Sequence, residues 1–253
     1  MADAGTKSAP ESAHHTQKSK PKKKLDHDDQ KHDNPGSPRL PPHPWRGVIA
    51  GASGTGKTYA ALEHFILDSD SPFDYVLWCG PAASLEQPKL KIAAEQAKMP
   101  IHFIEGIDEA KISAAMDTGK KEGLQGLIVL DDLMDQSSKS PFVEKLFTAG
   151  RHSNVSTLEL VQRIFTDGSR SHRLNTDLFL IFDFSARSEL AKLAQQMSPM
   201  RWRDIVRAYE DASRSPARFL MIDGCARRSL NPDHRKLSFR KGFDEAFVEL
   251  HDA

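Results

Sequence analysis

The chain contains a glycine-rich stretch whose residue types and spacing could bind phosphate: Gly51-Ala52-Ser53-Gly54-Thr55-Gly56-Lys57-Thr58. It matches the pattern G-x-x-x-x-G-K-[ST] at every fixed position, between an apolar run and a helix-prone segment. Glycines let backbone N–H groups curl around a phosphate, and the N-terminus of the following helix adds partial positive charge. We therefore expect a nucleotide to be held by Gly51, Ser53, Gly54, Thr55, Gly56, Lys57 and Thr58, with Lys57 reaching its β- and γ-phosphates.

Paired carboxylates follow a second apolar run, in which residues 126–130 lead directly into Asp131 and Asp132. This pattern accompanies the phosphate loop in many nucleoside triphosphatases. We expect Asp131, at the end of a buried strand, and the Thr58 hydroxyl to be the Mg²⁺ ligands, and Asp132 to be the general base that activates water. Many such ATPases place Glu at the second position. Because Asp is one methylene shorter, Asp132 must approach the water more closely or act through a second water.

A polar amide and two arginines lie around a third apolar run, residues 156–161. Gln162 ends the run and can both donate and accept hydrogen bonds, which suits a sensor of the γ-phosphate; the alternative is a surface side chain at the end of a strand. Arg151 before the run, and secondarily Arg173 after it, could reach into a neighbouring subunit and stabilise charge at the γ-phosphate. Such a role requires a ring; otherwise each arginine is a surface or phosphate-contacting residue.

Strand-like and helix-like segments alternate from residue 45 onward. This alternation predicts an α/β fold of the RecA-like P-loop NTPase type, with a mainly parallel central sheet flanked by helices. The expected strands are 46–50, 75–79, 101–105, 126–130, 156–161, 178–182 and 218–222, and the expected helices are 59–67, 85–98, 108–118, 141–149, 187–197 and 201–212.

Three segments follow from this pattern and from composition. Residues 1–44 are poor in large apolar side chains and are expected to form a disordered charged tail. The ATPase domain is assigned to residues 45–225. Residues 226–253 are expected to hold a basic loop and one short amphipathic helix, Phe243–Leu250.

Composition limits the partners that the chain could have. Lys and Arg total 35, as do Asp and Glu, so binding to nucleic acid would need a local patch or an assembled ring. The basic segment Lys18–Lys24 could be a nuclear import signal, a phosphate-binding arm or a solvated linker. Apolar runs stay well below the ~20 residues of a membrane span, and no secretory signal is expected. Cys79 and Cys225 are too few for a disulfide framework or a cysteine-rich metal site.

Several segments of the chain together resemble the poxvirus-type genome-packaging ATPases of the FtsK/HerA superfamily, which occur in large DNA viruses, Maverick/Polinton-like elements and adintoviruses. They are Asp131–Met134, Leu146–Ser156, Leu160–Phe165 and Arg173–Asp177. The resemblance covers roughly residues 45–225, and its most specific parts are Gly150–Asn154 and Leu160–Phe165. The phosphate loop alone is shared by many ATPases.

The resemblance implies a viral motor that hydrolyses ATP to thread double-stranded DNA into a capsid. It assigns phosphate binding to Gly56, Lys57 and Thr58, Mg²⁺ and water activation to Asp131 and Asp132, and the sensor role to Gln162. The implied partners are DNA bound without sequence preference, further copies of the chain in a ring, and a capsid or portal protein. The implied location is intracellular, at the viral assembly site or in the host nucleus, with association with the virion also open.

Two other functions remain open on the sequence. One is another RecA-like DNA ATPase, such as a ring helicase or a resolution motor. The other is a nucleotide-gated interaction protein that binds ATP and a partner without processive translocation. Arg201, Arg203 and Arg207, interleaved with Trp202, are candidate contacts to DNA phosphates, and a partly solvated amphipathic helix is the equally open alternative.

Overall fold

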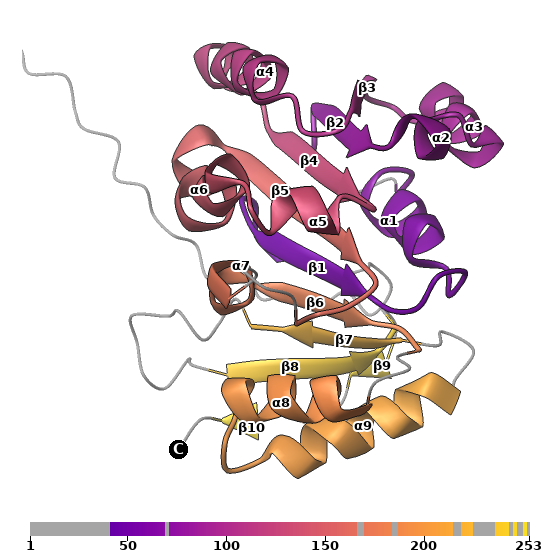
Figure 1. The fold of residues 1–253 in the computed structure, drawn as a ribbon, viewed down its shortest axis with the longest axis vertical. Helices are drawn as coiled ribbons and strands as arrows, with labels where there is room; N and C mark the ends of the chain where they lie inside the picture. The colour runs from indigo at the N-terminus through magenta and orange to yellow at the C-terminus, as the bar shows by residue number, and fades with distance from the viewer. Residues whose placement is uncertain are drawn as a thin grey trace, which may run out of the picture. The chain divides into compact units, whose positions relative to one another are not determined.

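A computed structural model describes residues 41–68, 71–165, 170–183, 187–214, 219–224, 236–242, 245–246 and 250–251, and all structural statements below concern these residues. Their strands form one sheet in the order β10-β8-β7-β6-β1-β5-β4-β2-β3, with β9 paired to β8 (Figure 1). The parallel strands are β1 (Arg46–Ala50), β2 (Tyr75–Gly80), β3 (Ile101–Glu105), β4 (Gly126–Asp131), β5 (Val155–Val161) and β6 (Leu178–Ile181). The antiparallel strands are β7 (Leu220–Asp223), β8 (Lys236–Lys241), β9 (Glu245–Ala246) and β10 (Leu250–His251).

Helices cover both faces of this sheet. The core on one face contains buried side chains of α1 (Lys57–Phe65) and α3 (Pro88–Gln96). The core on the other face contains those of α4 (Glu109–Glu122), α6 (Pro141–Ala149), α8 (Arg187–Met197) and α9 (Trp202–Arg214). Every residue of β1, β2, β4 and β5 is buried, as expected for parallel strands that are covered on both faces. The predicted α/β class with a mainly parallel sheet is therefore confirmed.

Shorter helical segments fill the connections: α2 (Ala82–Leu85), α5 (Met134–Ser137), α7 (Arg170–Asn175) and the 3₁₀ turn η1 (Gly150–Ser153). The single helix expected over 85–98 is divided, because α2 ends at Leu85 and α3 starts afresh at Pro88, where proline is compatible with a first helical position. Asp108 caps the start of α4, since its carboxylate accepts the Lys111 N–H at 3.0 Å. None of the described helices combines the length and the hydrophobicity that a bilayer crossing needs.

The C-terminal segment differs from the expectation. The sheet continues past residue 225, since β8 pairs with β7 and Phe239 is buried in the core. The helix expected over Phe243–Leu250 is wrong, because Glu245–Ala246 and Leu250–His251 form strands that both pair with β8. Pairing with the free backbone groups of β8 therefore outweighs the local helical pattern. The predicted basic loop of this segment lies mostly outside the described residues.

The N-terminal boundary also shifts. His43, which the sequence placed in the tail, hydrogen-bonds through Nδ1 to the Ser156 hydroxyl at 2.9 Å and through Nε2 to the Asn154 carbonyl at 3.0 Å. These contacts attach the residues before β1 to the start of β5, so the fold includes residues before Trp45. Residues 1–40 of the predicted tail, with Lys18–Lys24, lie outside the described residues.

Candidate nucleotide site

The phosphate loop leaves the carboxyl end of β1 and is fixed by backbone contacts to two neighbouring segments. The Gly51 N–H donates to the Val161 carbonyl at 3.2 Å, and the Ala52 N–H donates to the Asp183 carbonyl at 3.0 Å. A Cβ on Gly51 would lie 2.7 Å from the Cβ of Phe182, so the turn excludes any side chain there. Gly54 and Gly56 have φ values of 79° and 101°, in the region that glycine adopts without strain.

The side chains of the loop are turned onto its own backbone. The Lys57 ammonium donates to the carbonyls of Gly51 and Ala52, each at 2.9 Å, and the Thr55 hydroxyl donates to the Ala52 carbonyl at 2.8 Å. Burial lowers the pKa of Lys57, while the negative charges of Asp131 and Asp132 oppose that change. The lysine therefore lies partly buried at the base of the loop, within the electrostatic reach of both carboxylates.

The paired carboxylates and the glutamine meet beside the loop because β5 lies between β1 and β4. Asp131 is buried, with 8% of its surface exposed, and this burial raises its pKa to about 6. Asp132 is exposed and has φ 55°, a left-handed conformation that Asp tolerates better than most residues. The Gln162 side-chain amide donates to an Asp132 carboxylate oxygen at 3.1 Å. The two side chains predicted to handle water and γ-phosphate are therefore in direct contact.

A cavity of about 360 Å³ joins these groups. Of the predicted residues, those that line it are Ser53, Gly54, Gly56, Lys57, Thr58, Asp131, Asp132 and Gln162. Gly51 and Thr55, also predicted to bind phosphate, do not line the cavity but shape the loop through the contacts given above. The sequence therefore identified the residues that the phosphate loop and the ends of β4 and β5 contribute to this cavity, except Leu160.

The other lining residues were not predicted: Tyr59, Ser84, Gln87, Lys89 and Leu160. Ser84, Gln87 and Lys89 come from the segment that follows β2, which reaches the cavity because β2 pairs with β4. No local motif marks them, and only the strand order could have found them. Tyr59 directly follows the motif, so an aromatic residue next to Thr58 was the only signal in the sequence; in the structure 65% of its surface is exposed.

The cavity offers oxygen ligands that suit a magnesium ion. The Thr58 hydroxyl and the Asp131 carboxylate both line it, and Mg²⁺ is commonly held by one or two carboxylates together with waters and substrate phosphates. Among the described residues, no group of three or more His, Cys, Asp or Glu side chains could form a dedicated metal cage. The residues present therefore fit an ion that arrives with a nucleotide.

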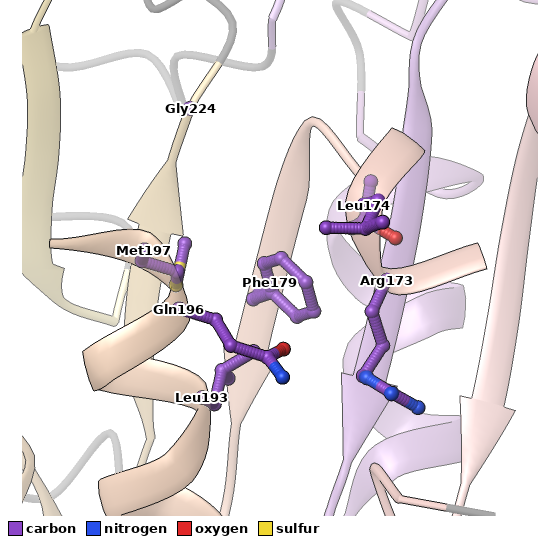
Figure 2. A pocket seen from close by; sticks show the side chains of 8 residues that line it. Arg173, Leu174, Phe179, Leu193, Gln196, Met197 and Gly224 are labelled. Carbon is purple, nitrogen blue, oxygen red and sulfur yellow. The ribbon is translucent and has the colours of Figure 1, made fainter. Parts of the chain in front are cut away.

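The two candidate arginines lie elsewhere in this subunit. Arg173 stacks over the Phe165 ring, 4.2 Å from its centroid, and donates to the Ile164 carbonyl at 3.3 Å. It lines a second pocket of about 270 Å³ between α7, β6 and α8, together with Phe179, Leu193 and Gln196 (Figure 2). Arg151 has its backbone in η1, before β5 and thus at the opposite end of that strand from Gln162; its side chain lies outside the described residues.

The loop after Gln162 is held by a buried acid that the sequence did not reveal. Glu189, with 6% of its surface exposed, accepts the backbone N–H groups of Ile164 and Phe165 at 3.1 and 3.4 Å. It also accepts the Arg163 guanidinium at 3.2 Å. Together with the bond from Arg173, these contacts fix both backbone polar groups of Ile164 and connect the loop to α8.

Comparisons with known proteins agree with the architecture and with the resemblance. Residues 90–208 match the family model described as Poxvirus A32 protein, a range that contains Asp131, Asp132 and Gln162 but starts after the phosphate loop. This match confirms the resemblance that the sequence indicated. Among curated proteins, none matches this sequence.

Solved structures show the same fold in a viral protein. The DNA-packaging ATPase B204 of Sulfolobus turreted icosahedral virus has a TM-score of 0.53 at 15% identity, covering 71% of this chain and 92% of its own. The genome-packaging NTPase B204 of Sulfolobus turreted icosahedral virus 2 in complex with ATP-γS has a TM-score of 0.52 at 16% identity, with the same coverage. At these identities the likeness establishes the fold, that of a P-loop NTPase.

Proposed function

We propose that this chain is an ATPase whose hydrolysis of ATP moves double-stranded DNA into a viral capsid. The observation that carries the proposal is the meeting of Lys57, Thr58, Asp131, Asp132 and Gln162 in one cavity at the carboxyl ends of adjacent strands. The family match over residues 90–208 and the fold shared with packaging NTPases support the packaging role.

The chemistry at this site follows from the positions of the side chains. The loop N–H groups and the N-terminus of α1 bind the phosphates of ATP. Lys57 exchanges its bonds to the Gly51 and Ala52 carbonyls for bonds to the β- and γ-phosphates. Thr58 and Asp131 would hold a Mg²⁺ ion, which would supply positive charge beside the phosphate oxygens. Asp132 accepts the proton of the attacking water, which must lie beside the Gln162 amide because that amide already contacts the Asp132 carboxylate.

Gln162 is the group that detects whether the γ-phosphate is present. Its amide donates to Asp132, and with respect to the described residues its other hydrogen-bonding positions are available to water or phosphate. The following loop is tied to α8 through Glu189, so a shift at Gln162 reaches the α8–α9 region. On α9, Arg203 and Arg207 are exposed, and Arg203 stacks on Trp202. These arginines, with Arg201, would contact DNA phosphates without reading bases.

Assembly and partners extend the same proposal. A ring of copies around the DNA, attached to a capsid or portal protein at the viral assembly site or in the host nucleus, would place Arg151 or Arg173 of one copy near the nucleotide of the next. Because Arg173 is bound to Ile164 and Phe165 in its own subunit, a trans role for it requires those contacts to open.

Steady-state hydrolysis of ATP, with and without long double-stranded DNA, tests the proposal. Lys57→Ala should abolish turnover, and Lys91→Ala, an exposed lysine paired with Glu86, is the matched control that should leave turnover intact. Strong stimulation by DNA supports a translocating motor. Hydrolysis that is indifferent to DNA favours a nucleotide-gated interaction protein, and near-normal hydrolysis in Lys57→Ala contradicts the assignment of the phosphate loop.

A further inference from the structure

A second lysine lines the nucleotide cavity. Lys89 occupies the second position of α3 and lines the same cavity as Lys57, Thr58 and Asp131. In the sheet, the order β1-β5-β4-β2 places the two lysines on either side of the strand ends that carry Asp131 and Gln162. Figure 1 shows α1 beside β1, and α2 and α3 beyond the end of β2. The cavity therefore has one ammonium group on each flank.

The segment that leads to Lys89 packs closely against the end of β4, the strand that ends in Asp131. A Cβ added to Gly80, the last residue of β2, would lie 3.3 Å from the Asp131 carbonyl oxygen and 3.8 Å from the Asp131 Cβ. Further along, Leu90 is 1% exposed and belongs to the same core cluster as Ala61 and Phe65 of α1. The residue next to Lys89 is thus anchored in the core, so the position of the lysine relative to the phosphate loop is fixed by packing.

Lys89 lines the same cavity as the side chains of Asp131 and Asp132. None of the ion pairs between described side chains includes Lys89, whereas Lys91, two residues later on α3, is paired with exposed Glu86. A cation that faces a carboxylate-lined cavity, instead of a surface partner, is placed to meet an anionic ligand.

We propose that Lys89 contacts the γ-phosphate of ATP and stabilises the charge that develops there during hydrolysis, in the same subunit as the phosphate loop. The inference rests on the proposed ATPase function. In this step the water oxygen bonds to the γ-phosphorus, and the bond from that phosphorus to the oxygen bridging to the β-phosphate breaks. ADP carries away that electron pair, and Asp132 receives the proton of the water. Lys89 donates hydrogen bonds to a γ-phosphate oxygen and keeps its own proton.

The test compares Lys89→Ala with Lys91→Ala and Lys89→Arg, which share the same helix. First, direct binding of ATP-γS and ADP to wild type and variants is measured with Mg²⁺. Lys89→Ala should lose affinity for ATP-γS by about tenfold or more while its affinity for ADP changes little, because only the γ-phosphate contact is removed. Second, kcat for ATP should fall by about 10² or more in Lys89→Ala, as when one transition-state donor is removed. Lys89→Arg should retain most of the preference for the triphosphate, and Lys91→Ala should match wild type in both measurements.

Three results would overturn the inference. Equal loss of ATP-γS and ADP affinity places Lys89 against another part of the nucleotide. Unchanged affinity for both ATP-γS and ADP means that Lys89 does not contact the nucleotide. If kcat of Lys89→Ala stays within about threefold of wild type, Lys89 does not stabilise the transition state to the extent proposed. If the wild-type protein binds nucleotide but does not hydrolyse it, the proposed ATPase function fails, and the binding comparison still decides the contact of Lys89.

Discussion

The buried carboxylate Asp131 should make the protein less stable at neutral pH than it would be without that charge. Its pKa is raised from 3.8 to about 6, chiefly by burial, so the folded protein binds this proton more tightly than the unfolded chain does. The stabilising contribution of the protonated form is present below pH 3.8 and is lost as the pH rises through about 6. At about 1.4 kcal/mol per unit of pKa, the ionised carboxylate costs the fold up to about 3 kcal/mol above that range.

Asp131→Asn removes the charge and keeps the shape of the side chain. Without nucleotide or Mg²⁺, we expect the variant to be more stable than wild type by about 2 kcal/mol at pH 8, which corresponds to roughly 4–8 °C in Tm for a chain of this size. The difference should fall to about a third of this value at pH 4.5 and approach zero below about pH 3.8, where Asp131 is protonated in the folded and the unfolded wild-type protein alike. Thermal and urea unfolding at pH 4.5, 6 and 8 measure this trend.

Two controls separate the charge of Asp131 from general effects. Asp132→Asn alters the adjacent but exposed carboxylate and should change stability little at any of these pH values. Added Mg²⁺ and ATP-γS should stabilise wild type but stabilise Asp131→Asn much less, because the variant lacks the carboxylate that we propose as a ligand of the ion. An Asp131→Asn variant that is no more stable than wild type at pH 8, or equally more stable at pH 4.5, would refute the reasoning.

Three further substitutions test other parts of the structure. Gln162→Ala should lower kcat by about 10² while ATP-γS affinity stays within about threefold, and a parallel loss of affinity would contradict a role confined to the reacting phosphate. Gly51→Ala should destabilise the fold by about 1–3 kcal/mol in urea unfolding, because its new Cβ would lie 2.7 Å from the Cβ of Phe182; an unchanged midpoint would contradict the packing argument. Asp177→Ala leaves the buried guanidinium of Arg46 without the carboxylate that it contacts at 2.9 Å and should cost about 3–5 kcal/mol, whereas a loss below 1 kcal/mol would show that other partners suffice.

The site residues that could be predicted are those that belong to short, recognisable sequence motifs. The phosphate loop, Asp131 and Gln162 each follow an apolar run directly, and parallel strands bring their carboxyl ends to one edge of the sheet. Lys89 and Gln87 follow no motif. They line the cavity because β2 is hydrogen-bonded to β4, and that pairing depends on the order of strands in the finished sheet. Helical structure over 85–98 was predicted from the sequence, but not the cavity that α3 borders.

The same distinction applies to the fold. Strands with apolar side chains on both faces were recognisable because burial on both faces leaves little choice of residue type. The C-terminal segment was predicted as a helix from its local pattern, although Glu245 and Leu250 belong to strands that pair with β8. Whether a segment pairs with a neighbouring strand depends on residues outside that segment, so its own short sequence pattern does not reveal the pairing. Errors of this kind are therefore expected where pairing is antiparallel and the strands are short.

The role of Glu189 could not be predicted from its residue type and its position on a helix. Read as sequence, it is an acid in the first turn of an amphipathic helix, where a solvent-exposed carboxylate is favourable with the helix dipole. In the structure it is buried and accepts two backbone N–H groups of the loop that follows Gln162. A buried carboxylate is tolerated only when its oxygens are paired, and here the pairing partners are the backbone of Ile164 and Phe165 and the side chain of Arg163. We therefore expect the orientation of Gln162 toward Asp132 to depend on Glu189, 27 positions later, because Glu189 holds the backbone of the residues that directly follow Gln162.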